Sequence, residues 1–253
     1  MIETANKRLN RRINKFLDRI FSKTPMAKKL QKTIDFAELQ KIESVLNQHG
    51  FTFRQFKNIL EFGCRDGRLT RYLFDLAPRG KIFGCDIALK ELKNCRKKFP
   101  QGCFIHNKTT PPLPLEDNQF DFIYSYSVFT HLSEENQKNW LKELSRVLKL
   151  GGVMLHTIHS YECLKRLSLF SPESIGKYGL PEDDVEKFIQ SAKPYHYTID
   201  NEKMPEYGLT IIHSDYVAKM WPLYSNTKVL EHAVGAIECY PEGPQDIVLM
   251  AKI

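Results

Sequence analysis

The sequence predicts a doubly wound α/β domain with a mostly parallel, seven-stranded sheet and a helical extension at the N-terminus. From residue 58 onward, short apolar segments alternate with amphipathic helical segments, which is typical of βαβ units around a parallel sheet. The first strand ends in a glycine-bearing turn that leads directly into a helix, as at the ligand crevice of such sheets. With 253 residues, 42% of them hydrophobic, the chain is long enough to bury a core of this size.

Seven segments combine the length and the apolar pattern of buried strands. They cover residues 58–62, 81–85, 103–106, 120–125, 153–158, 227–233 and 246–252. Helical spacing of apolar side chains marks residues 67–76, 88–98, 134–148 and 214–221. Gly151 and Gly152 follow the helix at 134–148 and are expected to end it, because glycine accepts the backbone conformation found after a helix C-terminus.

Residues 1–50 are predicted to be a helical extension of the main domain, which covers residues 51–253. Near the N-terminus, apolar side chains recur at helical spacing and basic side chains fill much of the remaining turn. The apolar positions are Leu9, Ile13, Phe16, Leu17 and Ile20. We expect residues 1–24 to pack on the main domain or on a second copy of the chain in a homodimer. Peripheral contact of residues 1–24 with a membrane surface is the alternative.

Two further segments complete the expected organisation. A second helix is expected to begin at Asp35, whose carboxylate can cap it while Glu38 bonds back to the cap, and to end at Gly50. After residue 160 the periodic pattern gives way to a polar stretch that contains prolines. We therefore expect residues 160–208 to be an insertion in the sheet domain.

The positive charge of the chain belongs to one segment. The net charge is +7, but residues 1–32 alone hold ten Lys and Arg against two acids. The other 221 residues are therefore close to neutral and carry no broad positive field that would steer a polyanion. This distribution disfavours nucleic acid as a partner.

The six cysteines form no C-x-x-C pair and have no histidine at zinc-ligand spacing, so we expect no metal site and reduced thiols. No apolar run reaches the roughly 18 residues that a membrane-spanning helix needs. The N-terminus is also too polar for the apolar region of a signal peptide. These features predict a soluble, cytoplasmic protein.

Two features of the predicted strand ends indicate a nucleoside-containing ligand. The first strand runs into Glu61-Phe62-Gly63-Cys64-Arg65-Asp66-Gly67, where glycines let a ligand lie against the backbone. The second strand ends at Asp86, and a carboxylate there can accept both hydroxyl groups of a ribose. Dinucleotide-binding folds use a similar turn, so these features alone leave the reaction open.

Four ordered motifs in the second half of the sheet domain narrow the interpretation. They are Pro111-Pro112-Leu113-Pro114, Phe120-Asp121-Phe122-Ile123-Tyr124-Ser125, Val128-Phe129-Thr130-His131-Leu132 and Leu144-Ser145-Arg146-Val147-Leu148-Lys149-Leu150-Gly151-Gly152. With these motifs, residues 55–160 resemble the Rossmann-like class I methyltransferases that use S-adenosylmethionine. The segments Ile212–Tyr216 and Gln245–Val248 resemble a bacterial subgroup that modifies small molecules or glycans.

The resemblance implies a role for each residue of the glycine turn. Glu61 would hold the ammonium group of the donor's methionine moiety, and Gly63, Cys64 and Gly67 would shape the loop beneath it. Arg65 departs from the family, which usually has glycine at this position. Its side chain must therefore point away from the cofactor.

The resemblance also implies the remaining donor contacts. Asp86 would bind the ribose, Ile87 would pack against the adenine, and Asn107 would lie near the adenine amine. The stretch Ser125, Tyr126 and Ser127 would lie beside the sulfonium of S-adenosylmethionine, which becomes S-adenosylhomocysteine. Residues 160–208 would cover the acceptor.

A catalytic base is needed only if the attacking atom must lose a proton, because methyl transfer depends mainly on alignment. The candidates are His159, His213 and His131, with His156 near them at the end of the fifth strand. A purely structural role is the alternative for each of them. His131, for example, could cap the helix that begins near Ser133.

These observations predict a methyltransferase that acts on the oxygen or nitrogen of a small molecule, natural product or glycan. Methyltransferases of nucleobases resemble one another in an Asn/Asp-Pro-Pro-aromatic stretch, whereas this chain has Ser125-Tyr126-Ser127-Val128 at that place. A lipid or quinone methyltransferase at the membrane surface is one alternative. A regulatory protein that binds S-adenosylmethionine without catalysis is the other.

Overall fold

The computed structural model describes residues 24–170, 175–176, 180, 185–190, 193–199, 207–239 and 243–253. The chain divides into two compact units, Met1–Gln40 and Lys41–Ile253. The amphipathic helix expected within residues 1–24 lies outside the described residues, apart from Thr24. The functional residues discussed below all belong to the second unit.

Helix α2 (Pro25–Gln48) begins earlier than the capping pattern at Asp35 predicted. The hydroxyl of Thr24 accepts a hydrogen bond from the backbone N–H of Ala27 at 3.1 Å, and proline suits the first helical position. Asp35 lies inside the helix, where its carboxylate accepts a bond from Nε2 of Gln31 at 2.9 Å. The prediction of a cap at Asp35 is wrong because Thr24 and Pro25 already provide the start signal.

The seven-stranded, mostly parallel sheet is confirmed, with the order β3-β2-β1-β4-β5-β9-β8. Strands β1 to β5 pair in parallel, and β9 and β8 add two antiparallel pairings at one edge. The bounds are β1 (Asn58–Phe62), β2 (Lys81–Asp86), β3 (Cys103–His106), β4 (Phe120–Ser125), β5 (Leu148–Ile158), β8 (Thr227–Cys239) and β9 (Gly243–Lys252). The carboxyl ends of β1, β2 and β4 therefore lie at one edge of the sheet.

The helices of the sheet domain follow the predicted pattern with shifted ends. They are α3 (Thr70–Leu76), α4 (Leu89–Lys98), α5 (Glu134–Val147) and α8 (Ser214–Ser225), with a short 3-10 turn at Phe53–Gln55. Ser133 caps α5 by accepting the N–H of Asn136, so His131 does not serve as this cap. Gly151 and Gly152 lie inside β5 instead of ending the preceding helix, because Leu148 already adopts an extended conformation.

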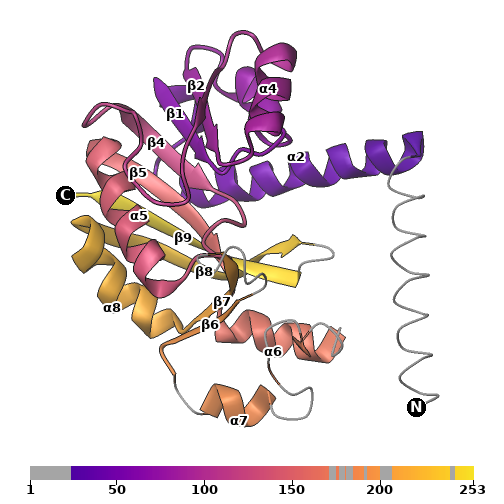
Figure 1. Cartoon of the computed structure of the whole chain (residues 1–253), viewed down its shortest axis with the longest axis vertical. Coiled ribbons are helices and arrows are strands. Elements are labelled where there is room, and N and C mark those ends of the chain that lie inside the picture. Colours follow the sequence, from indigo (N-terminus) through magenta and orange to yellow (C-terminus); the bar gives the residue numbers. More distant parts are fainter. Residues whose placement is uncertain are drawn as a thin grey trace. The chain divides into compact units, whose positions relative to one another are not determined.

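Helices α5 and α8 lie side by side along one face of the sheet (Figure 1). Between them and the sheet is an extensive apolar cluster, which includes the fully buried side chains of Trp140, Trp221 and Phe129. Phe56 and Phe122 stack at 4.9 Å between ring centroids. Removing this apolar surface from water stabilises the sheet and keeps the strand ends in fixed positions.

The segment after β5 is more regular than its sequence suggested. It contains α6 (Tyr161–Phe170), α7 (Val185–Gln190) and a two-stranded antiparallel sheet of β6 (Tyr195–Ile199) and β7 (Gly208–Ile212). Side chains from α6 and β7 form a second apolar cluster, with Tyr161, Leu164, Leu167, Ile175, Leu180 and Ile211. The polar composition hid these elements because each is short and buries only one face.

Candidate functional site

The glycine turn after β1 is held against the neighbouring strand. The backbone N–H groups of Gly63 and Cys64 both donate to the carbonyl oxygen of Cys85, at 2.8 and 3.0 Å. Gly63 has φ of 86°, and a Cβ there would lie only 2.3 Å from Cγ2 of Val128. Glycine at this position therefore permits both the left-handed backbone and the close approach of the loop after β4.

Arg65 occupies the position at which the sequence departs from the family pattern. Its φ is 47°, in the left-handed region, and its side chain is exposed. Its backbone N–H donates to Oδ2 of Asp86 at 2.7 Å. Gly67 closes the turn with φ of 77°. The backbone of Arg65 thus does what a glycine would do, while its side chain extends toward solvent.

Asp86 connects the ends of β1 and β2. Its Oδ2 accepts the N–H of Arg65, and its Oδ1 accepts the N–H of Ala88 at 2.8 Å. Each carboxylate oxygen has two lone pairs, so both can accept a further hydroxyl group. Ile87, the next residue, leaves 38% of its apolar side chain exposed. The turn after β2 therefore offers oriented acceptors beside an apolar surface.

Asn107 lies next to Asp86 at the end of β3. Its backbone N–H donates to the carbonyl oxygen of Asp86 at 3.1 Å, and its Nδ2 donates to the carbonyl of Lys108 at 2.7 Å. Its Oδ1 is buried and has no hydrogen-bond partner among the described residues. A buried acceptor without a donor is costly, and the amino group of an adenine would satisfy it.

Glu61 is a buried carboxyl group at the end of β1. Only 2% of the residue is exposed, and the hydroxyl of Thr70 donates to its Oε2. Burial raises the pKa of Glu61 to about 7, against the lowering effects of the Thr70 hydroxyl and the Arg68 charge. Glu61 is therefore close to half-protonated at neutral pH, and a cation placed beside it would favour the charged form.

The loop after β4 forms the facing wall. The Arg68 guanidinium lies 4.7 Å from the centre of the Tyr126 ring, in cation–π geometry. Ser127 has φ of 53° and donates its N–H to Oγ1 of Thr157 at 2.8 Å. Ser125 is fully buried, with its hydroxyl directed to another side chain of the interior. Arg68 was not predicted from the sequence, although its place directly after Gly67 is a usable signal.

The three candidate catalytic histidines gather around β7. His131 bonds Gly208 twice, through its carbonyl and through its Nδ1 at 2.8 Å to the carbonyl oxygen of Gly208. The carbonyl of His159 accepts the N–H of Ile212 at 2.9 Å, and His213 follows β7 directly. The structure therefore separates two groups of predicted site residues. Those assigned to the methyl donor lie at the ends of β1, β2, β3 and β4, and the histidines lie around β7.

The tautomers of two of these histidines follow from their partners. A carbonyl oxygen can only accept, so neutral His131 carries its proton on Nδ1 and keeps a lone pair on Nε2. His213 is the N-cap of α8, and its Nδ1 accepts the N–H of Asp215 at 3.2 Å. Neutral His213 must therefore carry its proton on Nε2. His131 is arranged as a proton acceptor, whereas His213 is arranged as a helix cap.

His156 and His159 are enclosed in the interior. His156 is fully buried and its Nδ1 lies 2.8 Å from the hydroxyl oxygen of Ser125, while His159 is 6% exposed. Burial lowers the pKa of each imidazole to about 3, and the charge of His131 adds to the lowering at His159. Both rings are therefore neutral at pH 7, and their low basicity is unfavourable for accepting a proton.

The residues at the strand ends fit an adenosine-containing cofactor. The carboxylate of Asp86 keeps lone pairs that could accept the hydroxyls of a ribose. Ile87 offers an apolar surface, and Asn107 has a buried acceptor oxygen without a partner among the described residues. Within the described ranges, no cluster of three or more His, Cys, Asp or Glu side chains could hold a metal ion. Of the helices in that part of the chain, none has the length and apolar character needed to cross a membrane.

Solved structures share this fold. An S-adenosylmethionine-dependent methyltransferase from Methanosarcina mazei matches with a TM-score of 0.59 at 15% identity, covering 81% of this chain and 96% of that chain. The 1,6-didemethyltoxoflavin-N1-methyltransferase from Burkholderia thailandensis, solved with S-adenosylhomocysteine, matches with a TM-score of 0.55 at 11% identity, covering 83% and 75%. The fold is thus that of the Rossmann-like class I methyltransferases.

Residues 60–156 match the family model described as a methyltransferase domain. A tRNA (carboxymethyluridine(34)-5-O)-methyltransferase from Arabidopsis thaliana is 36% identical over 105 residues, 41% of this chain and 24% of that protein. A malonyl-[acyl-carrier protein] O-methyltransferase from Legionella pneumophila is 23% identical over 140 residues, 53% of this chain and 49% of that protein. The chain thus spans between a quarter and a half of the length of these curated relatives. Its residues 60–156 match a methyltransferase domain, and its fold is that of the class I methyltransferases, which use S-adenosylmethionine.

The enclosed histidines make the stability of the protein sensitive to acid. Below pH 6.5 the unfolded chain binds a proton at His156, whereas the folded chain does not bind it until about pH 3. The contribution to stability is therefore present above pH 6.5 and is lost as the pH falls toward 3. Relative to His156→Gln, the wild type should lose about 1.4 kcal/mol of unfolding free energy per pH unit in this window.

Urea denaturation at pH 7, 6 and 5 would measure this difference in slope. The matched control is His106→Gln at the exposed end of β3, which should leave the pH dependence of the wild type unchanged. Parallel pH profiles for the wild type and His156→Gln would contradict the argument.

Proposed function

We propose that this protein is an S-adenosylmethionine-dependent methyltransferase that transfers the methyl group to the oxygen or nitrogen of a small molecule, natural product or glycan. One observation carries the proposal. The residues assigned to the methyl donor lie at the ends of β1, β2, β3 and β4 and meet at one sheet edge, and all four of these strands end within the stretch that matches the methyltransferase model. When bound, the donor supplies an electrophilic methyl group on a sulfonium.

The chain's own residues would hold the donor at both ends. The carboxylate of Glu61 would bind the ammonium of the methionine moiety, and the neighbouring Arg68 would attract its carboxylate. Asp86 would accept the ribose hydroxyls through the lone pairs that its backbone partners leave. Ile87 would pack on the adenine, and Oδ1 of Asn107 would accept from the adenine amine. Gly63, Cys64, Arg65 and Gly67 would supply the backbone beneath the donor.

The loop of Ser125, Tyr126 and Ser127 would set the position of the sulfonium end. The positive φ of Ser127 and its bonds to Thr157 and Gln245 make this loop rigid. A rigid wall favours alignment of the attacking atom with the methyl group, which is the main protein contribution to such a transfer. Residues 160–208, with α6, α7 and the β6–β7 sheet, would cover the acceptor.

Where the attacking atom must lose a proton, His131 is the best placed of the three histidines. Its Nδ1–H is held by the carbonyl of Gly208, and the ring stacks on Tyr207 at 4.6 Å. The lone pair on Nε2 is therefore presented in a fixed orientation. His159 would have to take up a proton, and so become positively charged, while buried in the protein. His213 already uses its acceptor nitrogen as a helix cap, so both would serve better as positioning residues.

The near-neutral charge of residues 33–253 supports a small-molecule or glycan acceptor over nucleic acid. The tRNA methyltransferase and the malonyl-[acyl-carrier protein] methyltransferases among the partial relatives name two other acceptors to test. Residues 1–24 are proposed to pack on the main domain or on a second copy of the chain, with contact with a membrane surface as the alternative.

Donor binding is expected to depend on Asp86. Replacing Asp86 by alanine removes the acceptors for both ribose hydroxyls and the bond to the Arg65 backbone. The affinity for S-adenosylhomocysteine should fall by about 1.5–3 kcal/mol, or roughly ten- to 150-fold. Isothermal titration calorimetry would measure this affinity. The control is Asp75→Ala on the exposed face of α3, which should leave the affinity unchanged. An unchanged affinity for Asp86→Ala would remove Asp86 from the donor site.

Donor binding is also expected to release a proton from Glu61. The pKa of Glu61 is about 7 in the free protein, and an ammonium beside it would lower that value. The affinity for S-adenosylhomocysteine should therefore fall by up to about tenfold per pH unit below pH 7. At pH 6, the binding enthalpy of the wild type should differ between buffers of different ionisation enthalpy. In Glu61→Gln this difference should vanish, and a buffer-independent enthalpy in the wild type would refute the linkage.

Turnover should reveal the acceptor. Radiolabelled donor is incubated with the protein and a panel of phenols, amines, carboxylic acids and sugars, beside malonyl-acyl carrier protein and tRNA. We expect product only with a low-molecular-weight or glycan acceptor, whereas transfer solely to tRNA or to the carrier protein would overturn the proposed acceptor class. With the active acceptor, His131→Asn should slow single turnover by about 10²–10⁴-fold if a proton is lost, while the affinity for S-adenosylhomocysteine stays unchanged.

A further inference from the structure

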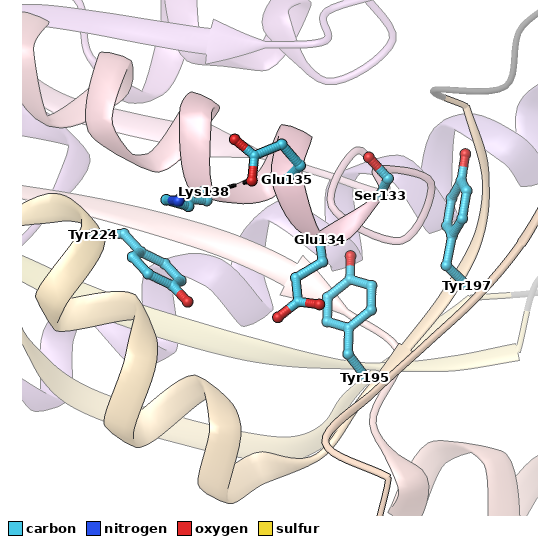
Figure 2. A pocket seen from close by; sticks show the side chains of 7 residues that line it. All are labelled: Ser133, Glu134, Glu135, Lys138, Tyr195, Tyr197 and Tyr224. Carbon is cyan, nitrogen blue, oxygen red and sulfur yellow. Dashed lines mark ion pairs between the residues drawn. The ribbon is translucent and has the colours of Figure 1, made fainter.

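A cavity lies where α5, α8 and β6 meet. Its volume is about 520 Å³, in the range of pockets that take small organic molecules. It is lined by Ser133, Glu134, Glu135, Lys138, Tyr195, Tyr197 and Tyr224. Figure 2 shows Tyr224 on one side of Glu134, with Tyr195 and Tyr197 on the other. None of these residues is among the proposed donor contacts, although Tyr195 and Tyr197 belong to β6, which is part of the proposed acceptor cover.

The charges of this cavity favour a cation. Lys138 pairs with Glu135 at 3.8 Å, but the two side chains are 51% and 71% exposed, so the pair is weak. Glu134 forms no ion pair with any described residue, and its Oε1 accepts a hydrogen bond from the hydroxyl of Tyr216. The cavity is therefore lined by the carboxylates of Glu134 and Glu135 and by the ammonium of Lys138. Lys138 offsets Glu135, so the remaining negative charge is that of Glu134.

The tyrosine rings give the cavity aromatic walls. The hydroxyl of Tyr195 donates to the carbonyl of Leu132 at 2.6 Å, and burial holds the pKa of Tyr195 well above its usual value. The ring is therefore neutral and fixed in place. Nζ of Lys138 lies 5.9 Å from the centre of the Tyr224 ring, so the face of this ring is accessible to an ammonium group. Aromatic faces beside a carboxylate are the arrangement that binds organic ammonium ions.

We infer that this cavity is a binding site for a small organic ammonium compound, with the cationic group at Glu134 and between the rings of Tyr195 and Tyr224. Glu134 also stabilises the N-terminus of α5, as an acid in the first turn does. That role requires neither the facing tyrosines nor the cavity. The site goes beyond the proposed methyl transfer, because none of its lining residues is a proposed donor contact or the proposed base.

The test compares choline with 3,3-dimethylbutan-1-ol, which has the same shape but a neutral carbon in place of the nitrogen. Both are titrated into the full chain while NMR follows the amides of residues 133–138 and 195–197. Choline should bind at least about tenfold more tightly than the neutral alcohol, since the charge supplies the cation–π and carboxylate attraction. Equal affinities for the two compounds, or no shift of these amides with choline, would overturn the proposal.

Two variants locate the site. Glu134→Gln and Tyr224→Leu should each weaken choline binding by about tenfold. The matched control is Glu162→Gln, because Glu162 is also a first-turn acid, in α6, that accepts a hydroxyl from α8, at 3.3 Å from Ser214. Circular dichroism confirms folding of each variant. Unchanged choline affinity in both folded variants, or an equal loss in Glu162→Gln, would place the binding elsewhere.

Discussion

The bond between the Arg65 backbone and the Asp86 carboxylate holds the ligand edge of the sheet together. Asp86 also accepts the N–H of Ala88, so one carboxylate shapes the turns after β1 and β2 at once. Gly63, in the turn after β1, packs closely against Val128, so the loop after β4 also contacts these turns. The three turns therefore support one another before any ligand arrives. A surface that is already ordered loses little conformational entropy on binding, so more of the contact energy appears as affinity.

Desolvation sets the charge state beneath this edge. Burial raises the pKa of Glu61 and lowers the pKa values of His156 and His159, so in each case it favours the neutral form. The interior below the strand ends consequently holds few fixed charges at neutral pH. An ammonium group that reaches Glu61 would meet a carboxyl group in a medium of low polarity, where the attraction is stronger than in water.

Strand β7 connects the loops that follow β4 and β5. Gly208 bonds His131 after β4, and Ile212 bonds His159 after β5. The small β6–β7 sheet is thus anchored to two loops at the carboxyl end of the main sheet. The proposed donor contacts belong to the main sheet, whereas the elements proposed to cover the acceptor belong to a separate segment with its own apolar cluster. This division lets the acceptor side differ between proteins that share the donor side.

The sequence by itself determined the seven strands, the parallel core and the location of the residues that we propose to contact the donor. Hydrophobic periodicity and glycine turns are local properties, and strand order then places Glu61, Asp86 and Asn107 at one edge. Local patterns failed where two signals competed, as with the caps at Thr24 and Asp35.

Only the tertiary structure decided what each polar residue can do. The tautomers of His131 and His213 depend on partners that the fold brings to them, and the basicity of His159 depends on its burial by several segments. The cavity at Glu134 likewise requires α5, α8 and β6 to meet. Hydrogen-bond geometry and desolvation are set by neighbours distant in the chain, which is why no local pattern in the sequence reveals them.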